Sequence, residues 1–115
     1  MSIKRLEPGA RMSQAVVANG FVFLAGQVAT DPKTDVEAQT RQVLGEIDRL
    51  LAEAGTSKEK ILSATIYLAD VATFGQMNRA WEAWVPVGNK PARATVEARL
   101  VAPEYLVEIQ VVALA

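Results

Sequence analysis

The chain contains no cysteine and no histidine among its 115 residues. Without thiols it forms no disulfide, thiolate nucleophile or zinc–sulfur centre. Without imidazole it lacks the most frequent general base and metal ligand, and the Ser-His-Asp arrangement is excluded. A glycine-rich phosphate loop is also missing, since Gly20 and Gly26 stand alone. Any chemistry must therefore use arginine, carboxylates, hydroxyls, backbone groups and water, and we expect neither a metal nor a cofactor.

Charge and hydropathy exclude further classes of protein. Twelve basic and 13 acidic side chains are scattered along the chain and give a formal net charge of −1, so no basic stripe is available for nucleic-acid phosphates. No apolar run approaches the length of a membrane span, and the charged opening Met1–Arg5 does not resemble a signal peptide. We therefore expect one cytoplasmic domain, residues 1–115, with a buried core and no membrane or nucleic-acid partner.

Turn signals predict three strands near the N-terminus. The first covers residues 3–6 and ends at a Pro-Gly turn signal. Residues 15–18 and 21–25 are predicted to form a hairpin, because Asn19-Gly20 is a preferred two-residue turn with φ > 0 at both positions. Residues 11–14, before the hairpin, are expected to form a loop.

Helical periodicity predicts two helices. Asp35 is the expected N-cap of the first helix, which runs to about Ala54 and stops at Gly55. Asp70 is the expected cap of the second helix, which ends at Pro86. The apolar stripes of the two helices are Val36, Val43, Leu44, Ile47, Leu50, Leu51 and Ala54, and Val71, Phe74, Met77, Trp81 and Trp84. We interpret the aromatic stripe of the second helix as core rather than as a ligand site.

Two further strands carry the candidate functional residues. Pro91 biases the chain towards extended backbone, and residues then alternate from Arg93 to Leu100. Arg93, Thr95, Glu97 and Arg99 are predicted on one side of this strand, and Ala94, Val96, Ala98 and Leu100 on the other. The segment 107–113 also alternates, with Glu108 and Gln110 opposite its apolar residues. Two neighbouring strands are thus expected to present an arginine and a glutamate.

Arg93 and Glu108 allow two interpretations. An arginine held on a strand is a planar fork suited to a carboxylate, and a nearby glutamate can balance its charge or hold a water. The same two residues could instead form an exposed surface pair that contributes little to stability. Spacing alone leaves both interpretations open.

With a strand predicted at residues 61–68 between the helices, the order of elements is β-β-β-α-β-α-β-β. This order predicts an α+β fold in which one mixed sheet carries both helices on the same face, because crossover connections are right-handed. The other face would expose apolar residues: Val16, Phe21, Phe23, Val112 and Leu114, or their apolar neighbours, depending on the register. Such a face adheres to other surfaces in water, so we expect the chain to self-associate through it.

The C-terminal region resembles the signature of the RidA/YjgF family. The resemblance rests on the run Pro91-Ala92-Arg93-Ala94-x-Val96, on Arg99 and Val101, and on Val107-Glu108-Ile109. Further matching segments are Ala25-Gly26-Gln27, residues 64–70 and Met77-Asn78-x-x-Trp81. The opening from Arg11 to Val17 and the segment Trp81-Glu82-Ala83-Trp84 are similar to the YoaB-like branch of the family.

This resemblance implies a chorismate-mutase-like fold and a homotrimer with a central barrel-like core and sites between subunits. The founding activity of the family is hydrolysis of reactive enamines and imines, such as 2-iminopropanoate and 2-iminobutanoate, to 2-keto acids and ammonia. By this resemblance Arg93 would bind the substrate carboxylate and Glu108 would hold the attacking water. Thr95 would bind substrate and water through its backbone, while Asn78 and Gly26 would line or shape the cleft. No cofactor is implied.

Two departures from the family pattern keep other functions open. Met12 replaces a tyrosine and Ala25 replaces a serine of typical members, so the pocket is expected to be more apolar. A non-enzymatic protein that binds or senses a carboxylate metabolite is therefore the main alternative to a deaminase. An endoribonuclease, a label that some members carry, is least favoured because the chain has no histidine and no basic groove.

Overall fold

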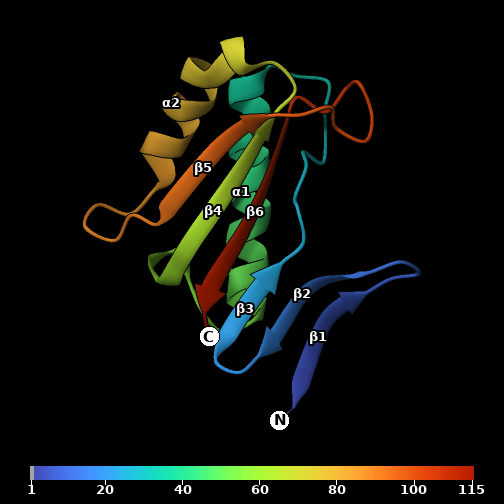
Figure 1. Cartoon of the computed structure of the whole chain (residues 1–115), viewed down its shortest axis with the longest axis vertical. Coiled ribbons are helices and arrows are strands. Elements are labelled where there is room, and N and C mark those ends of the chain that lie inside the picture. The colour runs from blue at the N-terminus through green and yellow to red at the C-terminus, as the bar shows by residue number, and fades with distance from the viewer. Residues whose placement is uncertain (1) are drawn as a thin grey trace.

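The computed structural model describes residues 2–115 and shows one six-stranded mixed sheet with two helices on one face (Figure 1). Met1, the first residue of the expected domain and of its charged opening, lies outside the described residues. The strands are β1 (Ile3–Pro8), β2 (Ser13–Ala18), β3 (Phe21–Leu24), β4 (Ile61–Leu68), β5 (Ala92–Glu97) and β6 (Val107–Leu114). The helices are α1 (Val36–Glu53) and α2 (Phe74–Trp84), with short 3-10 helices η1 (Lys58–Lys60) and η2 (Val71–Thr73). The predicted order and sheet type are confirmed.

The strand order in the sheet is β1-β2-β3-β6-β4-β5. β6 pairs antiparallel with both β3 and β4, so the strands joined by α1 run parallel with β6 between them. β4 and β5, which α2 joins, pair directly and in parallel. The prediction that the strands of Arg93 and Glu108 are neighbours is wrong, because the β4–α2–β5 crossover leaves β4 between β5 and β6.

Helix α1 covers the sheet as predicted. The Asp35 carboxylate accepts a hydrogen bond from the Ala38 N–H at 2.9 Å, and Gly55 follows the helix at φ +85°, where a side chain would be strained. The core joins α1 to the inner face of the sheet and to α2, through Val43, Leu44, Ile47, Leu50 and Leu51 of α1, Leu24, Ile66, Leu68, Ile109 and Val111 of the strands, and Met77 of α2. All the sheet residues of this list point to one face, and the positions of Ile109 and Val111 confirm the alternation predicted for residues 107–113.

The hairpin turn has the expected geometry, but several strand ends differ from the predictions. Asn19 and Gly20 lie at φ 53° and 81°, as a type I′ turn requires. β2 begins at Ser13, whose partner is Pro8 of β1, so the first strand is longer than predicted and Ser13 and Gln14 are not in a loop. β5 ends at Glu97 rather than Leu100, because its register partner is Leu68, the last residue of β4.

The second helix begins later than its cap residue suggests. Asp70 accepts a hydrogen bond from the Ala72 N–H at 2.9 Å, but it caps η2, and α2 begins at Phe74. Val71 and Phe74 are 52% and 42% exposed, so the first two residues of the predicted apolar stripe are not in the core. A 3-10 helix has about 3.0 residues per turn, whereas an α-helix has about 3.6. Counting α-helical spacing from Asp70 through η2 therefore assigns Val71 and Phe74 to the wrong face.

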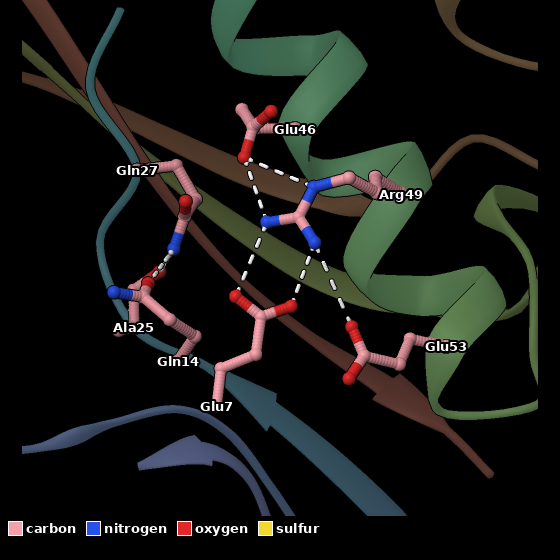
Figure 2. A network of polar contacts seen from close by, with 7 residues as sticks. All are labelled: Glu7, Gln14, Ala25, Gln27, Glu46, Arg49 and Glu53. Atoms are coloured by element: carbon pink, nitrogen blue, oxygen red, sulfur yellow. Dashed lines mark hydrogen bonds and ion pairs between the residues drawn. The ribbon is translucent and has the colours of Figure 1, made fainter. Parts of the chain in front are cut away.

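A polar network joins the end of β1 to α1 (Figure 2). The Arg49 guanidinium contacts the carboxylates of Glu7 at 2.6 Å, Glu46 at 2.9 Å and Glu53 at 3.6 Å. Hydrogen bonding by Arg49 lowers the pKa of Glu7, whereas hydrogen bonding to Glu7 raises the pKa of Glu53. Solvent screens these exposed pairs, so the network orients the β1 end more than it stabilises the fold.

Gln39 of α1 is fully buried and connects three segments. Its Nε2 donates to the carbonyls of Pro32 at 2.9 Å and Glu104 at 3.0 Å, and its Oε1 accepts from the Leu106 N–H at 3.0 Å. The amide therefore holds the segment before α1 and the β5–β6 connection against the helix.

We expect Gln39→Leu to destabilise the protein by about 2–4 kcal/mol, because it leaves buried backbone groups without partners. Urea unfolding at one fixed protein concentration measures the change. Gln76→Leu is the matched control, since Gln76 on α2 makes no side-chain hydrogen bond among residues 2–115. Equal losses in the two variants would show that the Gln39 amide is not needed.

Candidate functional site

Arg93 projects from β5 towards α2. Its Nη1 donates to Asn78 Oδ1 at 2.8 Å, and its Cζ lies 5.3 Å from the ring centroid of Trp81 and 5.7 Å from that of Phe74. Burial lowers the pKa of the Arg93 guanidinium, and the charge of Glu82 opposes this change. No carboxylate of residues 2–115 forms an ion pair with Arg93. The result is a partly buried cation that keeps free hydrogen-bond donors.

Thr95 follows on the same side of β5, and this part of the predicted alternation is confirmed. Its hydroxyl oxygen is buried and has no hydrogen-bond partner within the described part of the chain. Leaving a buried hydroxyl unpaired costs about 1–3 kcal/mol. Thr95 therefore adds a second polar group without a partner to the side of β5 that carries Arg93.

Glu108 lies on the opposite face of the sheet from Arg93. In the register of the central strands, Arg93 is aligned with Ala64 and Val111, both buried beneath the helices. Glu108 is aligned with Tyr67, one of the residues that alternate to the other face. The two charged groups therefore do not meet within one chain, and a pocket that contains both must include β5 of one chain and β6 of another.

Gly26 allows the chain to pass close to Glu108. The Gln27 N–H next to it donates to the Ile109 carbonyl at 2.8 Å, which brings this segment alongside β6. A Cβ built on Gly26 would overlap Glu108 Oε2 and would lie 2.9 Å from its Cδ. Only glycine leaves the carboxylate in its present position.

A hollow of about 380 Å³ lies over Glu108. Its other lining residues are Gly26, Tyr67, Gln110 and the segment 98–101, which contains Arg99. Arg99 was predicted on the same side as Arg93, but it follows the end of β5 and lines the hollow of Glu108 instead. The outer face of the sheet thus contains an acid, an exposed cation and two further polar side chains around one depression.

The other two predicted site residues contribute no polar side-chain group. The Ala25 N–H donates to the Gln14 carbonyl at 2.9 Å, and the Ala25 carbonyl accepts from Gln27 Nε2 at 3.0 Å (Figure 2). Met12, 49% exposed, lies in the turn between β1 and β2, at the opposite edge of the sheet from β5 (Figure 1). The predicted residues thus form three groups in one chain: Arg93, Thr95 and Asn78; Gly26, Ala25 and Glu108; and Met12.

No group of three or more Asp or Glu side chains among residues 2–115 is placed to hold a metal ion. Neither α1 nor α2 has the length and apolar character needed to cross a membrane.

Comparison with known proteins identifies the fold. A family model described as Endoribonuclease L-PSP matches residues 2–115. The RutC family protein YoaB of Escherichia coli is 43% identical over 113 residues, which cover 98% of each chain. This chain belongs to the RidA/YjgF family. A RutC family protein of Haemophilus ducreyi is 48% identical over 111 residues, which cover 96% of this chain and 95% of the relative. The crystal structure of a YjgF family member from Neisseria meningitidis aligns with a TM-score of 0.96 and 47% identity, over 99% of this chain and 95% of that one.

Membership of the RidA/YjgF family confirms the resemblance noted in the sequence. Pattern reasoning missed two neighbours of Arg93, namely Phe74 and Trp81, which were interpreted only as core. Trp81 is buried, but both rings also contact the Arg93 guanidinium. Asn78 was the sequence signal that this face of α2 is not only core. It shares the helix face with both rings, and a polar residue there does not fit a purely apolar core.

We expect Gly26→Ala to displace the Glu108 carboxylate with little loss of stability, because the overlapping atoms belong to the end of a flexible side chain. A crystal structure of the variant, together with its thermal midpoint, tests this expectation. Gly45→Ala is the control, since a Cβ there meets nothing within 4 Å and alanine favours a helix interior. An unmoved Glu108 in the Gly26→Ala structure would contradict the close approach.

Proposed function

We propose that this protein hydrolyses reactive enamines and imines of small carboxylic acids to 2-keto acids and ammonia, at a site between subunits. The observation that carries the proposal is the partly buried Arg93 guanidinium, which has no carboxylate partner among residues 2–115. Withdrawing a cation from water is unfavourable unless an anion or a set of hydrogen bonds compensates. An incoming carboxylate supplies that compensation, so 2-iminopropanoate and 2-iminobutanoate are suitable substrates.

Arg93 binds the substrate carboxylate in this proposal. A guanidinium and a carboxylate form two parallel charge-assisted hydrogen bonds, which fix orientation as well as position. Asn78 accepts only one Arg93 N–H and is neutral, so the charge of the guanidinium stays available to the ligand. Thr95 lies on the same side of β5 and contributes its backbone to the binding of substrate and water in this proposal.

Glu108 holds and activates the attacking water. An enamine tautomerises to the imine, whose carbon is electrophilic; the water oxygen bonds to this carbon, and one water proton reaches nitrogen by way of the carboxylate. The C–N bond then breaks as the remaining O–H proton passes to nitrogen, which leaves a keto group and ammonia. Positioning supplies most of the acceleration, since the reaction needs no cofactor and no redox step.

The site requires more than one copy of the chain, and we propose a homotrimer with a central barrel-like core. Arg93 and Glu108 point to opposite faces within one chain, so contact with the same substrate needs two chains. The face without helices also exposes large apolar side chains, namely Ile3, Phe23, Val96 and Leu114. Covering this face with other copies removes an adhesive surface from water.

A protein that binds a carboxylate metabolite without turning it over is the second candidate. Met12 and Ala25 favour it, because neither offers a polar side-chain group to a substrate or a water. In this case Arg93 would have the same role, and Glu108 would be a charged contact rather than a base. An endoribonuclease has less support, since the chain has no histidine to act as the acid or base.

We expect the protein to accelerate 2-oxobutanoate release in a threonine dehydratase reaction that contains semicarbazide, which traps the imine. Arg93→Ala and Glu108→Gln should each lower this acceleration by about a hundredfold or more, because each removes one essential group. Arg79→Ala is the matched control, since Arg79 on α2 pairs with Glu37, away from the site.

Calorimetry with 2-oxobutanoate separates the two candidates. Binding that Arg93→Ala abolishes, without any acceleration by the wild type, would establish the binding protein and reject the deaminase. Absence of both binding and acceleration would reject both.

Light scattering tests the assembly. The wild type should have the mass of three 12.4 kDa chains, and Phe23→Glu should lower that mass by placing a charge on the bare sheet face. Val87→Glu, at a position 92% exposed in the connection before β5, should leave the mass unchanged. A monomeric wild type that retains deaminase activity would overturn the intersubunit site.

A further inference from the structure

Three residues of α2 surround the Arg93 side chain. Phe74, Asn78 and Trp81 occupy positions i, i+4 and i+7, which lie on one face of a helix. Phe74 is 42% exposed and adds little to the core, whereas Trp81 is 6% exposed and belongs to it. What the three side chains share is contact with one guanidinium.

Both rings lie close to the guanidinium. Arg93 Cζ lies over the Phe74 ring, 5.7 Å from its centroid, and over the Trp81 ring, 5.3 Å from its centroid. Both distances are within the range of about 6 Å at which a cation is attracted to a ring face. Nη1 is occupied by Asn78 Oδ1. The edge formed by Nε and Nη2 has no hydrogen-bond partner in the described residues.

We propose that Phe74, Asn78 and Trp81 form an arginine slot that holds Arg93 in place and makes the site selective for planar carboxylates over tetrahedral anions. This inference rests on the carboxylate-binding role of Arg93 proposed above and assigns positioning roles to residues that act through it. The rings restrict the guanidinium by cation–π contact, and the Asn78 amide sets its rotation.

The geometry of the free edge gives the selectivity. A carboxylate places both oxygens in the plane of the guanidinium and accepts two parallel hydrogen bonds from Nε and Nη2. Phosphate or sulfate directs oxygens above and below that plane, towards the sides that the rings occupy. Partial burial of the Arg93 guanidinium strengthens the charge-assisted bonds of the anion that fits.

Asn78 provides a sharp test, because its aspartate variant keeps the size and shape of the side chain. Asn78→Asp would pair with Arg93 and cancel its charge, so 2-oxobutanoate affinity should fall by at least about tenfold. Gln76→Glu is the matched control: it adds the same charge to α2 two residues away, on another face of the helix, and should leave the affinity unchanged.

Phe74→Leu tests the aromatic wall at a largely exposed position, where folding is not at risk. We expect 2-oxobutanoate affinity to fall by about three- to tenfold and its preference over inorganic phosphate to narrow, because one side of the slot opens. If the protein is a deaminase, KM should rise while kcat is retained, since Glu108 and its water are not altered. Calorimetry with both anions and steady-state kinetics give these values.

Nuclear magnetic resonance of the Arg93 Nε–H group tests the slot without any reaction. In the unliganded wild type this resonance should be shifted by the ring currents and should exchange slowly with water, and Phe74→Leu should reduce both effects.

Unchanged resonance and affinity in Phe74→Leu and Asn78→Asp would overturn the slot even if the wild type is an active deaminase. Equal affinity of the wild type for phosphate and 2-oxobutanoate would overturn its selectivity. Carboxylate selectivity that depends on Phe74, without turnover, would support the slot and reject only the deaminase.

Discussion

The burial of one face of the sheet beneath two helices determines where every candidate functional group lies. Side chains alternate along a strand, so the complete burial of Ile66 and Ile109 orients all their neighbours on β4 and β6. Arg93 is in register with the buried side and meets α2, whereas Glu108 is turned to the face without helices. A slip of one residue in either pairing would exchange these faces and expose the core, which is why the register is strongly specified.

The position of α2 partly buries an arginine that lies on an edge strand. β5 is the last strand of the sheet, so α2 can shield the Arg93 guanidinium from water without enclosing it. Two rings and a neutral amide hold the cation, and none of them cancels its charge. The partial burial of a cation without a carboxylate partner among residues 2–115 is therefore the physical basis of the proposed carboxylate binding. On the other face, the missing side chain of Gly26 leaves room for the carboxylate of Glu108. The position of each charged group therefore depends on its immediate neighbours: α2 for Arg93 and Gly26 for Glu108.

Much of this arrangement follows from local signals in the sequence. The Asn19-Gly20 turn, the Asp35 cap and the alternation around Arg93 and Glu108 act over a few residues, and each has the predicted geometry. The start of α2 was misplaced because Asp70 is the N-cap of the 3-10 helix η2. A capping aspartate in the sequence does not distinguish a 3-10 helix from an α-helix. The contact of Phe74 with Arg93 was not predicted, because an aromatic residue at helical spacing is interpreted as core unless its partner on another strand is known.

The amino-acid sequence by itself determined the order of the elements, the alternation from Arg93 to Thr95 and along residues 107–113, and the absence of imidazole and thiol chemistry, because these depend on residue type and short spacing. Only the tertiary structure decided that β6 enters between β3 and β4, that Arg93 and Glu108 lie on opposite faces, and that Phe74, Asn78 and Trp81 surround the guanidinium. Strand adjacency is set by which apolar faces can be buried together, and that competition involves residues far apart in the chain.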